Sequence, residues 1–370
     1  MILAEKKNKR VDSGMDSQAF QIQASSKAFE ILSSGLYNNR ERAVLRELMC
    51  NAYDAHVAAN KKDVPFEVQL PTALEPTLTI KDYGTGLSEE EVYELYTTYF
   101  SSNKTDSNMF VGALGLGSKS PFSVADQFTV KSRYNGTETT YLCFISEEGI
   151  PQVSKVFESE TEEQNGMTIQ VGINKDYISK FREEYKSVVK PFALKPDVNG
   201  VDNSEVELYK NMDVTLEGKG WKWIKKTEFS RDDLSVIQGN VEYPLTISNL
   251  NIDHNLKEFF DDLLRSFQDK ILIYFPLGTL NIAANREELS LDDKTVKNIE
   301  KRLEVVKNEI KENAVNKIST INNDMELFSY CEKFGYSMRN IIKDLPWNTD
   351  GVTVGDVMSG KRIDEKYIGK

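Results

Sequence analysis

The ten residues 46–55 constrain the fold and function of this chain more than any other stretch. Apolar side chains recur here at helical spacing, which predicts an amphipathic helix with one side against a core. Glu47, Asn51 and Asp54 stand at i, i+4 and i+7, so all three leave the opposite side of the helix. Two carboxylates and an amide that converge in this way can hold a metal ion and activate a water molecule. A solvated polar face would show the same pattern, so the stretch by itself leaves both interpretations open.

Composition excludes several classes of protein. The 370 residues suffice for two domains and a tail, and 39% hydrophobic with 28% charged residues is typical of a soluble globular protein. The net charge of -12 argues against broad binding of nucleic acid, which needs clustered Lys and Arg. Three distant cysteines without a CxxC favour a reducing compartment and no structural zinc. No apolar run approaches the ~20 residues that span a bilayer, so we expect a cytoplasmic protein, with any membrane contact peripheral.

A second motif ends a predicted strand. Apolar and polar residues alternate over residues 77–82, and Asp82 falls on the apolar face of that strand. A carboxylate there would be costly to bury without a partner. Gly84 and Gly86 then break the strand. An acid at this place therefore predicts a specific partner for its carboxylate.

A third motif combines glycines with the start of a helix. Gly112, Gly115 and Gly117 precede Pro121, which suits the first turn of a helix. Free backbone N–H groups and the positive end of a helix both favour anions, so we expect a phosphate cradle here. The polar segment 99–111 before it is typical of a loop, and we expect it to move.

The remaining pattern predicts an α/β chain with a boundary near Pro191 and Pro196. The turn Asn135-Gly136 predicts a hairpin, and Ser88 with Glu91 predicts a capping box. We expect domains at 1–190 and 197–291 and a helical C-terminal region with a polar tail at 292–370. The expected helices are 26–36, 40–60, 88–98, 176–189, 256–267 and 290–322, and the expected strands are 66–70, 77–82, 128–134, 139–145, 152–157, 167–171, 204–209, 221–224, 237–247 and 271–275.

Together, at these spacings, the three motifs closely resemble the GHKL ATPases, the superfamily of gyrase B subunits, Hsp90 chaperones, histidine kinases and MutL proteins. Residues 46–55 follow the Hsp90-like pattern R-E-L-x-x-N-A-x-D-A, residues 77–86 follow T-L-T-I-x-D-x-G-x-G, and residues 112–120 follow G-x-x-G-x-G-x-x-S. The segment 280–287 is similar to their second-domain N-I-S-R-E with one extra residue. The resemblance implies an α/β sandwich with a mixed, largely antiparallel sheet, then a smaller transducer-like α/β domain and a helical tail.

A closer resemblance is to the phage RIIA lysis-inhibition protein family. The segments 27–34, 42–48, 99–104 and 115–123 are similar to that family's own sequences, as are 275–280 and 290–293. This resemblance implies a role during infection, in lysis timing or in protection against host or prophage exclusion. It also implies a second phage protein as partner and peripheral contact with the inner membrane.

The GHKL resemblance implies a role for each motif residue. Glu47 would be the general base for the attacking water, Asn51 the Mg²⁺ ligand, and Asp82 the acceptor of the adenine amino group. Arg286 would reach the γ-phosphate, although a surface pair with a neighbouring glutamate is the alternative. Lys104 and Lys119 would reach phosphates, with a solvated lysine as the alternative for each. The other expected nucleotide-binding residues are Asp54, Gly84, Gly86, Leu87, Gly112, Gly115, Gly117 and Ser118.

These roles predict Mg²⁺-dependent ATP binding with slow hydrolysis that switches conformation or drives homodimer formation. Three alternatives stay open: an Hsp90-like chaperone, a nucleotide-binding switch without useful turnover, and a MutL- or topoisomerase-like subunit. The charge of -12 argues against the last of these. A histidine kinase would need a phospho-acceptor histidine before the ATP domain, and no histidine precedes residue 46.

Overall fold

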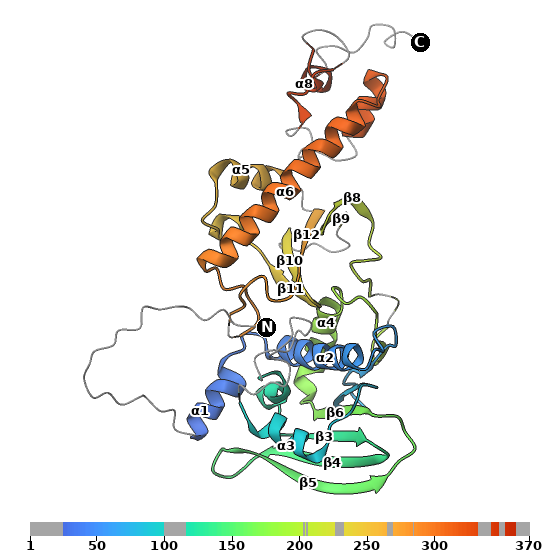
Figure 1. Ribbon diagram of the computed structural model, residues 1–370, viewed down its shortest axis with the longest axis vertical. Helices are drawn as coiled ribbons and strands as arrows, with labels where there is room; N and C mark the ends of the chain where they lie inside the picture. The colour runs from blue at the N-terminus through green and yellow to red at the C-terminus, as the bar shows by residue number, and fades with distance from the viewer. Residues whose placement is uncertain are drawn as a thin grey trace, which may run out of the picture.

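The computed structural model describes residues 25–99, 116–202, 204, 206–225, 233–264, 269–283, 285–331, 342–347 and 352–359. They form two α/β layers stacked along the long axis of the molecule, followed by helices (Figure 1). The larger sheet lies at one end, and helices α2 (Arg40–Ala58) and α4 (Ile178–Val188) lie between the two sheets. The long helix α6 (Asp293–Ile318) crosses the smaller sheet. This architecture confirms the predicted fold class, a mixed and largely antiparallel α/β sandwich followed by a smaller α/β domain.

The first sheet has seven strands in the order β5-β4-β3-β6-β2-β1-β7, and all neighbours are antiparallel except β1 and β7. The hairpin between β3 and β4 turns at Asn135 and Gly136, whose φ angles are 51° and 80°, as its sequence predicts. The strands are β1 (Glu67–Gln69), β2 (Thr77–Lys81), β3 (Gln127–Tyr134), β4 (Thr137–Ile145), β5 (Pro151–Glu160), β6 (Gly166–Gly172) and β7 (Asp197–Asn199).

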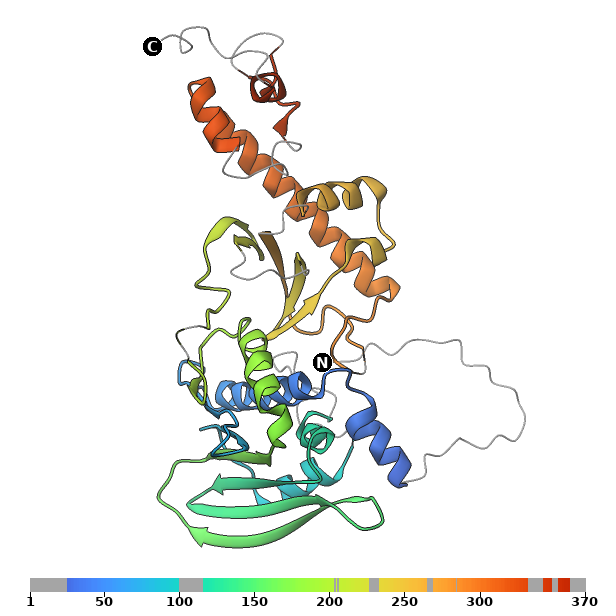
Figure 2. The ribbon, with the colours of Figure 1, turned by 180° about the vertical axis from the view of Figure 1, so that it is seen from behind.

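Helix α2 (Arg40–Ala58) is the central element of the first domain. Its first turn is capped by Asn39, whose side chain accepts from the N–H of Arg42. It packs on β2, β6 and α4 (Ile178–Val188), and Figure 2 shows α2 and α4 side by side. Both sides of α2 are covered. Its apolar side packs on the sheet, and its polar side packs on other parts of the protein. The solvated-face interpretation is therefore wrong for Glu47 and Asp54, each 1% exposed.

Shorter helices complete the first domain. The capping box at Ser88 and Glu91 is formed as predicted. The predicted helix 26–36 ends in one π-helical turn. These helices and turns are α1 (Ser26–Glu30), η1 (Ile31–Gly35), α3 (Glu89–Thr97), η2 (Gly117–Ser123) and η3 (Lys175–Tyr177).

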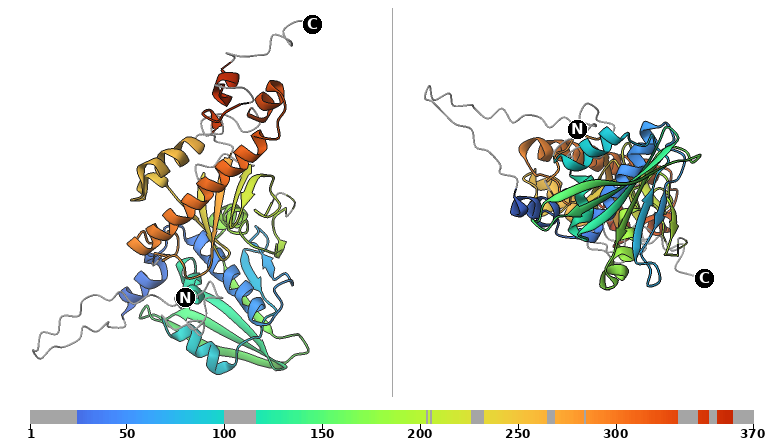
Figure 3. Two further views of the ribbon diagram at one scale, coloured as in Figure 1. Left: turned by 45° about the horizontal axis from the view of Figure 1, so that its top comes forward. Right: turned by 90° about the horizontal axis from the view of Figure 1, so that it is seen from below.

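The second sheet has the order β11-β10-β12-β9-β8, with β10 and β12 parallel. Helix α6 lies across it and contacts both α5 and β8 (Figure 3, left). Every residue of β10 is buried. The elements are β8 (Val214–Gly218), β9 (Trp221–Lys225), β10 (Leu234–Gln238), β11 (Val241–Pro244), η5 (Ile247–Asn249), α5 (His254–Leu263), β12 (Asp269–Phe275), α6 (Asp293–Ile318) and α8 (Val354–Met358).

Several expected elements need correction, among them the single strand 237–247, which is the antiparallel pair β10 and β11. Residues 197–199, where we expected the second domain to begin, form β7, which pairs with β1 of the first sheet. Among the described residues of 204–209 there is no strand, whereas β8 forms where none was predicted. The helix expected from residue 290 begins at Asp293, where Asp292 caps α6. Within the part of the chain that the structure describes, no helix is long and apolar enough to cross a membrane.

Candidate active site

The predicted general base lies at the contact between the two domains. Glu47 Oε2 accepts from Arg286 Nη1 at 2.5 Å, and Glu47 Oε1 accepts from Arg46 Nη2 at 3.3 Å. Burial opposes the positive charge of Arg286, but the Glu47 carboxylate outweighs it and raises the pKa of the guanidinium. Arg286 is 3% exposed and has a left-handed backbone with φ of 57°. The surface pairing of Arg286 with a neighbouring glutamate is therefore wrong.

The glycine motif packs directly on Glu47. A Cβ built on Gly117 would lie 2.5 Å from Glu47 Oε2, so only a glycine lets the backbone approach the carboxylate this closely. Two hydroxyls in the same turn, those of Ser118 and Ser120, are buried without a hydrogen-bond partner among the described residues. Buried donors normally find an acceptor. This turn therefore fits a ligand that supplies acceptors, as phosphate oxygens do.

The predicted adenine-reading carboxylate lies near the other end of α2. Asp82 is 6% exposed, and its Oδ1 accepts from the backbone N–H of Gly84 at 2.9 Å and of Met167 at 3.1 Å. Burial raises the pKa of Asp82, although the two backbone bonds oppose this. The sequence indicated that burial of this carboxylate would cost free energy. Two N–H donors offset that cost in part.

Two glycines shape the loop that follows Asp82. A Cβ on Gly84 would lie 2.7 Å from the Cβ of Ala55, so this glycine lets the loop rest on α2. Gly86 has a φ of 70° and lies against the carbonyl of Arg133. Leu87 follows, and its N–H donates to Ser132 Oγ at 2.9 Å. The predicted residues 84–87 thus form one anchored turn beside the end of α2.

The two halves of the site are separated along α2 by a distance that suits a nucleotide. Gly117 contacts Glu47, and Gly84 contacts Ala55, eight residues further along the helix. At 1.5 Å per residue this is roughly 12 Å. Asn51 lies midway and is half-buried. An adenine at Asp82 and phosphates at Gly117 would therefore lie along one side of α2, with Asn51 between them.

Some predicted residues lie elsewhere or outside the description. Lys119 donates from Nζ to the carbonyls of Leu95 at 2.5 Å and Thr98 at 2.7 Å, at the end of α3. Burial lowers the pKa of Lys119 to about 8. Lys119 is 2% exposed, so the solvated-lysine alternative is wrong, and these two bonds join α3 to η2. The expected contacts of Lys104, Gly112 and Gly115 lie outside the described residues.

Three residues that position the site had no predicted role in it. His56 joins α2 to the Asp82 loop, since its Nδ1 lies 2.9 Å from the carbonyl of Val64 and its Nε2 accepts from the N–H of Tyr83 at 2.8 Å. Arg133 is buried and donates to the carbonyl of Asp82 at 3.2 Å. Glu287 accepts from the N–H groups of residues 38 and 39. Only His56, two residues after Asp54 on α2, carried a signal that the sequence could have used.

The described part of the protein offers few side chains that could bind a metal ion. No group of three or more His, Cys, Asp or Glu side chains that could hold a metal occurs in the described part of the chain. Mg²⁺ needs few protein ligands when phosphates and waters supply the rest. Asn51, between Glu47 and the adenine end, is the residue that fits this role.

The first domain is similar to a known family of ATPases. Residues 37–171 match the family model of the histidine kinase-, DNA gyrase B- and HSP90-like ATPases. The first domain is of the GHKL type. The matched segment contains Glu47, Asn51, Asp82 and Gly117, and it stops before the second domain that provides Arg286.

The chain is also distantly similar to HtpG chaperone proteins. It is 27% identical to HtpG of Sulfurimonas denitrificans over 284 residues, which covers 70% of this chain and 42% of that protein. It is 24% identical to HtpG of Francisella tularensis over 276 residues, 66% of this chain and 40% of that protein. The similarity therefore extends beyond the GHKL domain, while the chain spans about two fifths of the length of these relatives.

Proposed function

We propose that this protein is a Mg²⁺-dependent ATPase in which nucleotide state controls the contact between the two domains. One observation carries the proposal: Glu47 of the first domain, Gly117 of the glycine motif and Arg286 of the second domain meet at one point. This is the place where a general base, a phosphate cradle and a phosphate-reaching arginine must converge. In this proposal Asp82 accepts from the adenine amino group, and a carbonyl at that position, as in guanine, would leave its carboxylate unpaired.

The ion pair suggests how the base is held before ATP arrives. Both oxygens of Glu47 accept from arginines, so in the resting state the protein itself binds the carboxylate. A γ-phosphate beside Gly117 offers Arg286 a second anion with several oxygens, which a planar guanidinium binds well. Transfer of Arg286 from Glu47 to the phosphate would free the base and place a cation where negative charge develops.

The remaining side chains bind and orient the substrate. The Ser118 hydroxyl, which is buried without a partner in the described residues, would donate to a phosphate oxygen. The Asn51 side-chain oxygen would hold Mg²⁺, which neutralises phosphate charge when it is bound. The loop Gly84–Leu87 would close the adenine end.

Turnover and binding measurements on single variants test this function. Glu47→Ala should bind ATP and lose turnover by about 100-fold or more, the usual contribution of a positioned base. Asn51→Ala should lose Mg²⁺-dependent binding. Full turnover by Glu47→Ala, in protein purified free of other ATPases, would remove Glu47 as the base. ATP binding without turnover by the parent would favour the switch without useful hydrolysis.

We further propose that the ATPase serves a chaperone-like role and works as a nucleotide-dependent homodimer. The similarity to HtpG proteins over two thirds of the chain supports the chaperone over the phage RIIA interpretation, which these comparisons do not support. The test is suppression of aggregation of a heat-unfolded model enzyme, with and without ATP, alongside light scattering to measure dimer formation. Equal aggregation with and without this protein would contradict the chaperone role.

A further inference from the structure

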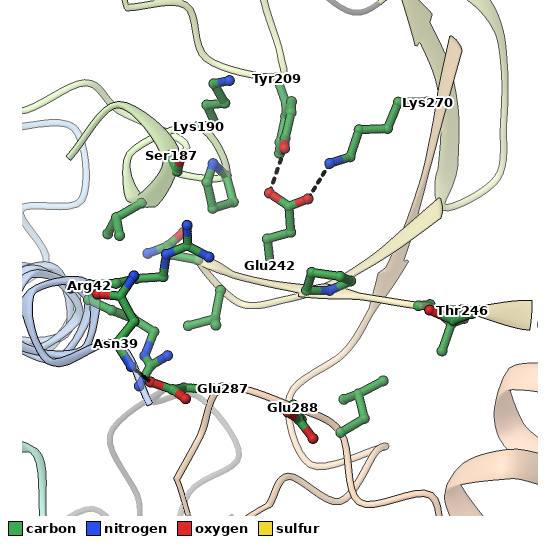
Figure 4. A pocket seen from close by; sticks show the side chains of 18 of the residues that line it. Asn39, Arg42, Ser187, Lys190, Tyr209, Glu242, Thr246, Lys270, Glu287 and Glu288 are labelled. Atoms are coloured by element: carbon green, nitrogen blue, oxygen red, sulfur yellow. Dashed lines mark hydrogen bonds and ion pairs between the residues drawn. The ribbon is translucent and has the colours of Figure 1, made fainter. Parts of the chain in front are cut away.

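A cavity lies between the domains, beside the start of α2. It has a volume of about 670 Å³. Its walls include Asn39 and Arg42 from α2, Lys190 from the end of α4, and Glu242 and Lys270 from the second sheet (Figure 4). Sites for small ligands favour domain interfaces and volumes of about 300–1,000 Å³. The size and place of this cavity therefore suit a small molecule.

Two of the three acids in the wall, Glu242 and Glu287, accept from donors of the protein, and the third, Glu288, is exposed to solvent. Glu242 accepts from Ser235 Oγ at 2.7 Å, from the Tyr209 hydroxyl at 2.5 Å and from Lys270, two of which Figure 4 shows. Burial alone would raise the pKa of Glu242, but the Lys270 charge and these hydrogen bonds outweigh it and lower the pKa. Glu287 accepts from two backbone N–H groups at 3.0 and 3.1 Å. Neither acid needs a cation from a ligand.

Donors, in contrast, remain in excess. Asn240 lines the cavity, is 7% exposed, and its Nδ2 has no hydrogen-bond partner among the described residues. Arg42 gives its Nε to Glu184 at 2.6 Å, which uses one of the five N–H groups of a guanidinium. Apolar side chains of both domains complete the wall, among them Val188, Pro191, Met212, Val241 and Leu289. A matching ligand would therefore be rich in acceptors at one end and apolar at the other.

We propose that this cavity binds a small organic anion, with a phosphate or carboxylate head near Arg42 and Asn240 and an apolar body against the remaining wall. Because both domains line the cavity, the ligand stabilises the docked arrangement of the domains. Arg46 lines the same cavity and donates to Glu47 and to the carbonyl of Asn285. The bound anion thus keeps Glu47 held and slows turnover, a consequence that rests on the proposed ATPase function.

Calorimetric titration of the full chain tests the site with two anionic probes, phenyl phosphate and phenylacetate, and neutral benzyl alcohol. At least one anion should bind in a one-to-one complex and the alcohol should not. Arg42→Gln and Asn240→Ala should each weaken binding by about fivefold or more, the loss of one charge-assisted or buried hydrogen bond. Arg40→Gln is the matched control, because Arg40 lies two residues away on α2 and lines a different cavity. No heat with either anion, or unchanged binding by both cavity variants, would overturn the proposal.

Turnover measurements then test the coupling. Saturating probe should slow ATP hydrolysis several-fold in the parent and leave Arg42→Gln unaffected, which also excludes competition at the ATP phosphates. Normal turnover with the anion bound would contradict the effect of the anion on ATP hydrolysis, but it would leave the proposed binding site unchanged. Absence of any ATP turnover would overturn the proposed function and the coupling with it, while calorimetry still decides whether the cavity binds the anion.

Discussion

In the proposed pocket, one carboxylate oxygen of Asp82 accepts from the protein and the other accepts from the ligand. Since Oδ1 accepts from the N–H groups of Gly84 and Met167, an asparagine would keep its oxygen there and turn its NH₂ toward the adenine amino group. Two donors would then face each other, so Asp82→Asn should lose ATP affinity by about tenfold or more. Calorimetry measures the affinity, and circular dichroism checks the fold. Exposed Asp126→Asn is the control, and parent-like binding by Asp82→Asn would remove Asp82 from the pocket.

The same carboxylate should make ATP binding sensitive to pH. Burial raises the pKa of Asp82 above the ordinary 3.8, so the folded protein protonates this group at a higher pH than the unfolded chain does. ATP affinity should fall as the pH falls through this raised pKa, because the protonated carboxyl loses its acceptor. The group by itself does not cause acid unfolding, since its contribution to stability is present below pH 3.8 and is lost as the pH rises through the raised pKa. Calorimetric titrations between pH 7 and the acid limit of folding measure the affinity, and a constant value would contradict the assignment.

The pair of Glu47 and Arg286 should stabilise the resting protein. Removal of one partner leaves a buried charge, so Arg286→Gln should lower the free energy of unfolding by about 3–5 kcal/mol. The double variant with Glu47→Gln should cost less than the sum of the two single variants. Urea unfolding without nucleotide measures the cycle. The exposed pair of Lys27 and Glu30, whose side chains are 73% and 62% exposed, is the control and should contribute much less, because water screens both charges. Additive effects at Glu47 and Arg286 would contradict the ion pair.

Sequence reasoning placed the acids of the site better than its cations. The spacing of Glu47, Asn51 and Asp54 is local, so a helical repeat suffices to bring them to one side of α2. The partner of Arg286 depends on a contact 239 residues away, and the carbonyls that hold Lys119 depend on where α3 ends. No local pattern fixes either contact, because both arise only when separate elements pack.

Helices, turns and strands differ in the same way: those with local hydrogen bonds were predicted, and one that depends on distant pairing was missed. The capping box of α3 and the Asn135-Gly136 turn were predicted because their hydrogen bonds join neighbouring residues. Strand β7 was missed, since its three residues form a strand only by pairing with β1, more than a hundred residues earlier. The alternation of residues 77–82 predicted β2 correctly, because one face of this strand is buried.

Contact between η2 and α2 should require a glycine at position 117. The methyl group of Gly117→Ala would meet Glu47 Oε2 at 2.5 Å, and Glu47 cannot yield easily because Arg286 holds the same oxygen. We expect turnover to fall by about tenfold or more, since small displacements of catalytic groups cost this much. Gly172→Ala is the matched control, because a Cβ there meets nothing within 4 Å. Equal turnover by both variants would place the phosphate cradle elsewhere.

At the scale of the whole molecule, two neighbouring residues join the second domain to α2. Arg286 reaches Glu47 inside the site, while Glu287 accepts from the N–H groups of Asn38 at 3.1 Å and Asn39 at 3.0 Å. A carboxylate at the start of a helix also interacts favourably with the helix dipole. The contact between the domains therefore depends on two interactions, that of Arg286 with Glu47 and that of Glu287 with the two N–H groups. ATP would compete for only the first, through Arg286.

This arrangement predicts that Glu287 keeps the domains together when Arg286 turns to the nucleotide. Glu287→Ala should leave two N–H groups without their partner and cost about 1–3 kcal/mol. With a non-hydrolysable ATP analogue, this variant should show a larger radius of gyration in small-angle scattering than the parent, because Arg286 has then left Glu47. Without nucleotide the Arg286 pair still holds and the difference should be smaller. Glu288→Ala is the control, since Glu288 is the exposed neighbour. Equal radii for both variants with the analogue bound would mean that contacts other than Glu287 hold the second domain on α2.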